Sequence, residues 1–201
     1  MAETPQRRVE IHPGGLLLPL GLLVSFQRYQ CSPDGIIAKA PSSLGVLPLG
    51  FDDHQNVLLP LGEDEAFWIG FSFTVPVQTF WLAVKALTSN GEERDAIGGG
   101  FWQEDQPQTV RLPGTQRLDG LLRGDGRFDS FFRCRSANRR YFLKELHMKL
   151  YDSSTRSSFN RMPLDSVYLR LEGYSSFARL TGHPPPVPLD PTAGYGGWYL
   201  P

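Results

Sequence analysis

The sequence predicts an all-β protein, either a sandwich or an open barrel of about seven to nine short strands, with at most one or two short helices. Three observations lead to this expectation. Apolar and polar residues alternate with a period of two in several segments. Glycine (21 residues) and proline (17 residues) recur between those segments, where they interrupt helices and favour turns. Aromatic residues, which are enriched in strands, make up 12% of the 201-residue chain.

The first half of the chain contains the clearest strand patterns. Residues 22–28 alternate between apolar and mostly polar positions, and the Ser-Pro-Asp-Gly turn at 32–35 precedes a short return strand at 36–38. A short apolar segment at 57–61 is followed by residues 66–73, where four apolar side chains share one face. Residues 79–87 are apolar on both faces, which predicts a central strand with Trp81 in the core.

The second half predicts further strands and one helix. Short strands are expected at 109–112 and within 127–132. Residues 141–151 and 166–173 alternate cleanly, and a short helix is expected at 175–180.

These patterns divide the chain into three parts. Residues 1–15 are expected to be a flexible arm, residues 16–181 a single β-rich domain, and residues 182–201 a Pro/Gly/aromatic tail packed on that domain. The apolar run Leu16–Leu23 is broken by Pro19 and Gly21, which argues against a signal peptide. Because no segment approaches the roughly 20 apolar residues of a membrane helix, a soluble, cytoplasmic protein without a membrane partner is the default expectation.

Charge and cysteine content weaken several function classes. The net charge is −1 and the pI is about 6.4, whereas proteins that bind duplex nucleic acids usually carry a basic excess. The two cysteines, Cys31 and Cys134, are expected to be free thiols. Neither the cysteines nor the four histidines have metal-ligand spacing, so we expect no metal site and no cofactor.

Several short motifs, taken in order, resemble a family of uncharacterised bacterial proteins. They are Leu22–Arg28, the 32–35 turn, Glu65–Phe71, Phe80–Leu87 with its Ala-Val-Lys, Leu118-Asp119-Gly120, and Gly182–Pro186. In that family, "MWxxF" is followed by "AVKxxxG", "QPWLDG", "VRQF" and a proline-rich aromatic tail. This chain lacks the "PW" before Leu118 and the "QF" after Arg127, and it is shorter after Phe132. The resemblance implies a bacterial origin and a similar layout but no known activity.

Four titratable residues are weak candidates for catalysis. Asp119 and Asp129 belong to a cluster of acidic residues near Gly120 and Gly126, in which the Asp-Gly pairs equally predict plain turns. Glu65 ends a run of three acids that could attract a cation, although such runs are more often solvated turns. His147 lies two residues from Glu145 on a polar strand face, where a surface or cross-strand histidine is the plainer interpretation.

A basic segment suggests a second kind of site. Arg133, Arg135, Arg139 and Arg140 lie in a predicted hairpin at 133–144, with aromatic residues before and after them. Arginines beside aromatics can bind phosphate or stacked bases. The alternative is a solvated hairpin tip.

Aromatic residues that are expected to be exposed suggest a third kind of site. Trp68 and Trp198, with Tyr195 and Tyr199 of the tail, are the candidates for a ligand or partner surface. The leading hypothesis is therefore a non-catalytic β-domain that binds a protein partner or itself. The alternatives are a small-molecule-binding protein or enzyme with a pocket between the sheets, and phosphate or nucleic-acid binding through the 133–144 hairpin.

Overall fold

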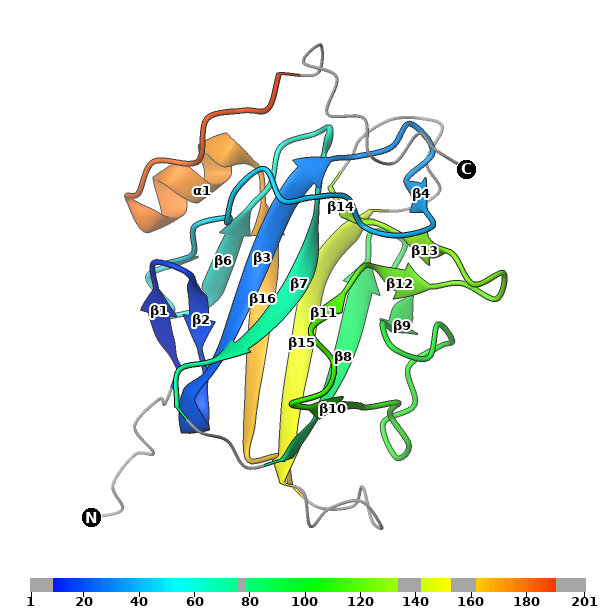
Figure 1. Ribbon diagram of the computed structural model, residues 1–201. Coiled ribbons are helices and arrows are strands. Elements are labelled where there is room, and N and C mark those ends of the chain that lie inside the picture. The colour runs from blue at the N-terminus through cyan, green and yellow to red at the C-terminus, as the bar shows by residue number, and fades with distance from the viewer. Residues whose placement is uncertain (1–8, 76–78, 134–141, 153–161, 191–201) are drawn as a thin grey trace, which may run out of the picture.

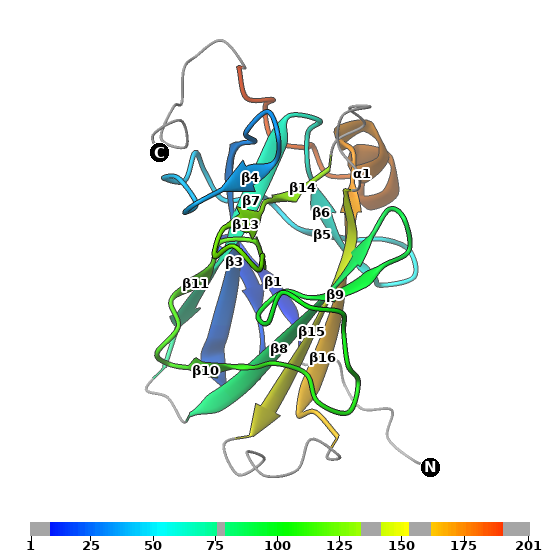
Figure 2. The same cartoon turned by 90° about the vertical axis from the view of Figure 1, so that its right-hand side faces the viewer.

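Two stacked β-sheets make up most of the molecule (Figures 1 and 2), as seen in a computed structural model that describes residues 9–75, 79–133, 142–152 and 162–190. The first sheet is antiparallel, and its strands, in spatial order, are β1 (Glu10–His12), β2 (Gly15–Leu17), β3 (Leu22–Gln30), β7 (Glu65–Phe73) and β11 (Arg117–Leu118), with β14 (Phe131–Phe132) also paired to β7. This all-β architecture confirms the predicted fold class.

The second sheet lies across the core from the first. Its strands, in spatial order, are β10 (Val110–Leu112), β8 (Phe80–Thr88), β15 (Leu143–Asp152), β16 (Asp165–Glu172), β6 (Val57–Pro60) and β5 (Gly50–Phe51), with β9 (Glu93–Asp95) also paired to β8. β8 has partners on both sides, so the predicted central strand is confirmed. Its Trp81 is only partly buried on the outer face, however, because the inward positions belong to Leu82 and Val84.

A small third sheet covers one outer edge of the sandwich. It consists of β12 (Leu121–Leu122), β13 (Phe128–Asp129) and β4 (Ile36–Ile37). A second, smaller apolar cluster lies beneath it, formed mainly by Tyr29, Ile37, Ala66 and Phe132.

The main core fills the space between the two sheets. Alternate side chains of β3 and β7, such as Phe26, Phe67 and Ile69, meet those of β8, β15 and β16, such as Val84 and Leu146, and all five are fully buried. Removing this much apolar surface from water is the main stabilising term of the fold. The period-two patterns of the sequence therefore point to the correct core face.

One strand pair in the second sheet is parallel, and it brings two segments of the chain to the same end of the sandwich. β16 runs parallel to β6, with Leu169 opposite Val57 and Glu172 opposite Pro60. Because paired parallel strands end at the same edge of a sheet, residues 61–63 and 173–176 leave the sheet together.

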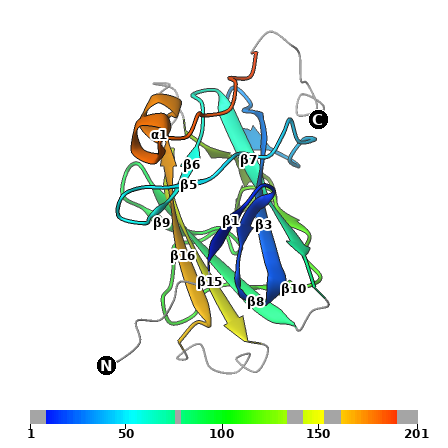
Figure 3. The same ribbon diagram turned by 90° about the vertical axis from the view of Figure 1, so that its left-hand side faces the viewer.

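The helix α1 (Tyr174–Thr181) follows β16 directly and lies beside β5 and β6 (Figure 3). It confirms the helix expected at 175–180, and its buried residue is Phe177. The packing is close: a Cβ on Gly50 of β5 would lie 2.5 Å from Cγ2 of Thr181. A short 3-10 turn, η1 (Pro19–Gly21), precedes β3.

The structure differs from the expected division of the chain at its N-terminal end. β1 and the start of β2 fall within residues 1–15, for which the polar pattern predicted a loose arm. Leu16 pairs with Val24 of β3, so a neighbouring strand supplies the order that this short segment lacks by itself. No helix in the described part of the chain is long and apolar enough to span a membrane.

Candidate functional site

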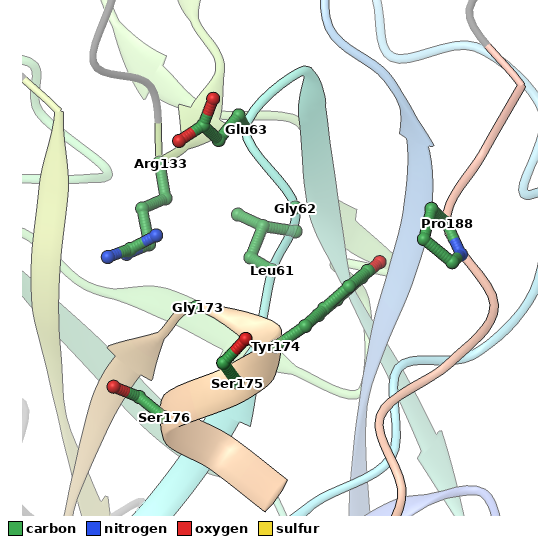
Figure 4. A pocket seen from close by; sticks show the side chains of 9 residues that line it. All are labelled: Leu61, Gly62, Glu63, Arg133, Gly173, Tyr174, Ser175, Ser176 and Pro188. Carbon is green, nitrogen blue, oxygen red and sulfur yellow. The ribbon is translucent and has the colours of Figure 1, made fainter.

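A pocket of about 420 Å³ opens at the end of the sandwich where three strands end (Figure 4). Residues 61–63 follow β6, residues 173–176 follow β16, and the parallel pairing of those strands brings both segments to one place. Arg133 follows β14, and Phe132 of β14 pairs with Ala66 of β7. The pocket therefore lies between the ends of the two sheets, with Pro188 as a further wall.

Arg133 contributes a guanidinium group to this pocket. Its side chain lies against Gly173, where an added Cβ would lie 2.8 Å from Nη1. With the described residues, Arg133 makes no hydrogen bond or ion pair. A guanidinium has five N–H donors, so its capacity is open to a ligand in the pocket.

The first turn of α1 presents further donors to the same pocket. The N-cap residue is Gly173, which has no side chain to accept the free backbone N–H groups, and the first turn contains no acidic residue. Ser175 and Ser176 add hydroxyl groups, and the helix dipole is positive at this end. Glu63 also lines the pocket, but it is exposed and its charge is solvated. Arg133, Ser176 and the backbone N–H groups that follow Gly173 are the partly buried polar groups of the pocket, and they favour a negatively charged ligand.

Glu65, one of the predicted catalytic candidates, is buried beside the pocket rather than solvated with its acidic neighbours. Only 3% of the residue is exposed. The carboxylate lies 3.5 Å from Arg28 Nη1, and it accepts a hydrogen bond from the hydroxyl of Tyr174. The Gly62 N–H (3.2 Å) and the Leu189 N–H (3.0 Å) also donate to it. The buried charge is tolerated because each oxygen has a partner.

Arg28 and Glu65 lie where the apolar core ends. Arg28 continues the inward face of β3 after Phe26, and Glu65 precedes Phe67 on the inward face of β7. Tyr174 joins them from α1, and burial together with the Glu65 carboxylate raises the pKa of its hydroxyl. Tyr174 therefore remains protonated and keeps donating to Glu65.

The two aspartates predicted as catalytic candidates are engaged in ion pairs. Asp129 lies 2.8 Å from Arg123 Nη1 and 3.7 Å from Arg94 Nη1, while Asp119 lies 2.7 Å from Arg117 Nε. These contacts hold the small third sheet and β11 in place. Carboxylates paired in this way support the structural interpretation of the acidic cluster.

His147 was expected to be a surface or cross-strand histidine, and the structure places it in the cross-strand position with only 6% of the residue exposed. It lies opposite Lys85 and Tyr168 on the outer face of the second sheet, and its ring stacks on Tyr168 at 3.7 Å between centroids. Burial, followed by Lys149 and Lys85, lowers its pKa to about 4. Because His147 faces outward and Glu65 faces the interior, the two do not form one site.

Seven predicted site residues remain. Trp68 is described by the structure, and the other six lie outside the described ranges. Trp68 is partly exposed on the first sheet, where its Nε1–H donates to the Pro41 carbonyl (3.1 Å) and the Arg117 guanidinium lies 5.4 Å from its ring centroid. The residues outside the described ranges are Arg135, Arg139, Arg140, Tyr195, Trp198 and Tyr199. Among the residues that are described, no three histidine, cysteine or acidic side chains group as a metal site.

No family model, curated protein or solved structure matches this chain. The resemblance to a family of uncharacterised bacterial proteins therefore stays a prediction, and the candidate site depends on its geometry alone.

Proposed function

We propose that this protein binds a small anionic molecule, bearing a phosphate or carboxylate group, in the pocket at the end of the sandwich. The observation that carries the proposal is the guanidinium of Arg133, which is partly buried in a pocket and bonded to no described residue. Guanidinium and oxyanion form the strong, charge-assisted hydrogen bonds that would fill this capacity. The proposal assigns binding and no reaction to the pocket.

The size and walls of the pocket support a ligand larger than an inorganic ion. A volume of about 420 Å³ is within the range of small-molecule sites. Leu61 and Tyr174 supply apolar surface beside the polar groups. We therefore expect an aromatic or aliphatic phosphate to bind more tightly than inorganic phosphate.

The proposal develops the small-molecule and phosphate hypotheses drawn from the sequence. Binding of a protein partner through exposed aromatics was the leading hypothesis from the sequence. It rests largely on tail residues outside the described ranges, so we rank it second here. A cytoplasmic location and a bacterial origin stay predictions from the sequence.

The test is a binding titration with inorganic phosphate, phenyl phosphate and benzoate, measured by calorimetry. Arg133→Gln should weaken binding by about tenfold or more, because a charge-assisted hydrogen bond contributes about 1.5–3 kcal/mol. The matched control is Arg127→Gln, which removes the same charge at a side chain that is 53% exposed and paired with Asp125. Equal binding by both variants, or no binding by the unaltered chain at about 10 mM probe, would refute the proposal.

A further inference from the structure

The segment at 183–190, here called the strap, crosses the end of β3 and β7 and is held there through its main chain. Arg28 Nη1 donates to the Val187 carbonyl (2.8 Å), and the Leu189 N–H donates to Glu65 Oε1 (3.0 Å). The carbonyl and the amide are two residues apart, with Pro188 between them. Arg28 and Glu65 thus contact a carbonyl–proline–amide unit, and Tyr174 is hydrogen-bonded to both of them. These three residues are here called the clamp.

The side chains of Val187 and Pro188 contribute little to this contact, whereas those of Pro185, Pro186 and Leu189 are half-buried. Val187 is 82% exposed, and Pro188 is also exposed. The clamp therefore recognises a main-chain carbonyl and a main-chain amide two residues apart, and not the side chain at position 187. Any extended peptide with a carbonyl, a proline and then an amide presents the same groups.

The strap sequence suits this mode of recognition. Pro184, Pro185, Pro186 and Pro188 favour an extended polyproline conformation, which lowers the entropy lost on binding. Pro188 lies between the bonded Val187 carbonyl and the bonded Leu189 amide. Because proline has no N–H, this position adds no backbone donor that would need a partner of its own. Figure 4 shows Tyr174 extending from α1 toward Pro188.

An empty clamp is unfavourable. Without the strap, the Arg28 guanidinium and the Glu65 carboxylate would each lose a hydrogen-bond partner, and their side chains are only 12% and 5% exposed. Buried charged groups that lose a partner are costly. A peptide that replaces the strap restores both bonds, and one with the sequence of the strap also replaces its half-buried apolar side chains.

We propose that the clamp is a recognition site for an extended, proline-containing segment of a partner protein, and that the strap occupies this site in cis. The partner segment has the form x-Pro-x and binds through its main chain. Tyr174 and Pro188 also line the anion pocket, so the two sites adjoin. The clamp proposal does not require anion binding, since Arg133 and the two serines take no part in it.

The experiment uses a fluorescent peptide with the sequence of residues 184–190 and measures its binding to the full-length protein. Leu189→Pro in the protein removes the amide donor of the strap and leaves the clamp unaltered. This variant should bind the peptide at least about tenfold more tightly than the unaltered chain, because the cis competitor is weakened. Val187→Ala, which keeps both main-chain contacts, should behave as the unaltered chain does.

Two controls decide whether the clamp is the site. Adding Arg28→Gln to Leu189→Pro should abolish binding, and a peptide carrying Leu189→Pro should not bind any variant. Thermal melting verifies that each variant is folded. In the unaltered chain, excess peptide should also speed hydrogen exchange at the Leu189 amide, a readout that needs no substitution.

Three results would overturn the inference. The first is a folded Leu189→Pro protein that binds no peptide at about 1 mM. The second is binding that survives Arg28→Gln. The third is a concentration-dependent dimer of the unaltered chain, which would assign the clamp to strap exchange between copies.

Discussion

Single residues at the end of the core carry charge where the alternation predicts apolar side chains. Arg28 and Glu65 occupy inward positions of β3 and β7, and each has its partner on another segment. A local pattern cannot distinguish such a carboxylate from a solvated one, because the difference lies in burial and in donors that come from Gly62, Tyr174 and Leu189.

The Arg28–Glu65 pair leads to a stability prediction. Glu65→Ala should lower the free energy of unfolding by about 3 kcal/mol, because it leaves the buried guanidinium of Arg28 without its only anionic partner among the described residues. The double variant Arg28→Met with Glu65→Leu should lose clearly less than the sum of the single variants. Guanidinium denaturation of the double-mutant cycle measures this, and simple additivity would contradict it.

His147 leads to a pH prediction. Its pKa is about 4 in the folded protein, against an ordinary value of 6.5. Between these values the unfolded chain binds a proton that the folded chain does not, so stability should fall as pH drops from 6.5 toward 4. The loss contributed by this residue should reach about 3 kcal/mol.

Denaturation measured across that pH window tests this. His147→Phe keeps a ring to stack on Tyr168 and cannot titrate, so it should flatten the slope. His183→Asn, a change at an exposed histidine, should leave the slope as it is. An unchanged slope in His147→Phe would show that other groups cause the pH dependence.

At the scale of elements, the glycines at its two ends and the buried Phe177 fix the position of α1. Gly173 ends β16 and begins the helix, and Gly182 at φ +71° ends it with its N–H bonded to the Ala178 carbonyl. Between them, Phe177 anchors the helix to β5 and β6. The N-terminal turn therefore stays at the pocket.

Ser175→Asp separates the stability of this helix from its role in binding. An acid in the first turn interacts favourably with the helix dipole, so the melting temperature should stay the same or rise. The same charge lines the proposed anion site at an exposed position, where water screens it, so affinity for phenyl phosphate should fall by about threefold. Arg179→Gln, at the other end of the helix, serves as the control. Unaltered affinity in Ser175→Asp would place the anion elsewhere.

At the scale of the whole molecule, the pocket results from how two sheets end. β6 and β16 belong to the second sheet, while β14 belongs to the first. Segments at 61–63, 133 and 173–176 meet only because the sheets stack and because one strand pair is parallel. The strap then crosses this end of the sandwich, where Arg28 bonds to Val187 and Glu65 bonds to Leu189.

The sequence predicted the all-β class, the strong strands at 66–73 and 79–87, and the short helix near residue 177. Those features follow from period-two alternation and from turn residues, which are local properties. It also named Arg133 and Glu65, because charged residues beside aromatic strands are visible in the sequence.

Their roles, and the involvement of Arg28, Tyr174, Ser175 and Ser176, depended on the packing of the sheets. These residues are up to 148 positions apart, between 28 and 176, and no local pattern links them. Side-chain alternation is decided by the geometry of one strand, whereas a site between sheets is decided by which strands end together. That depends on long-range pairing, and here the parallel pairing of β6 with β16 brought the site together.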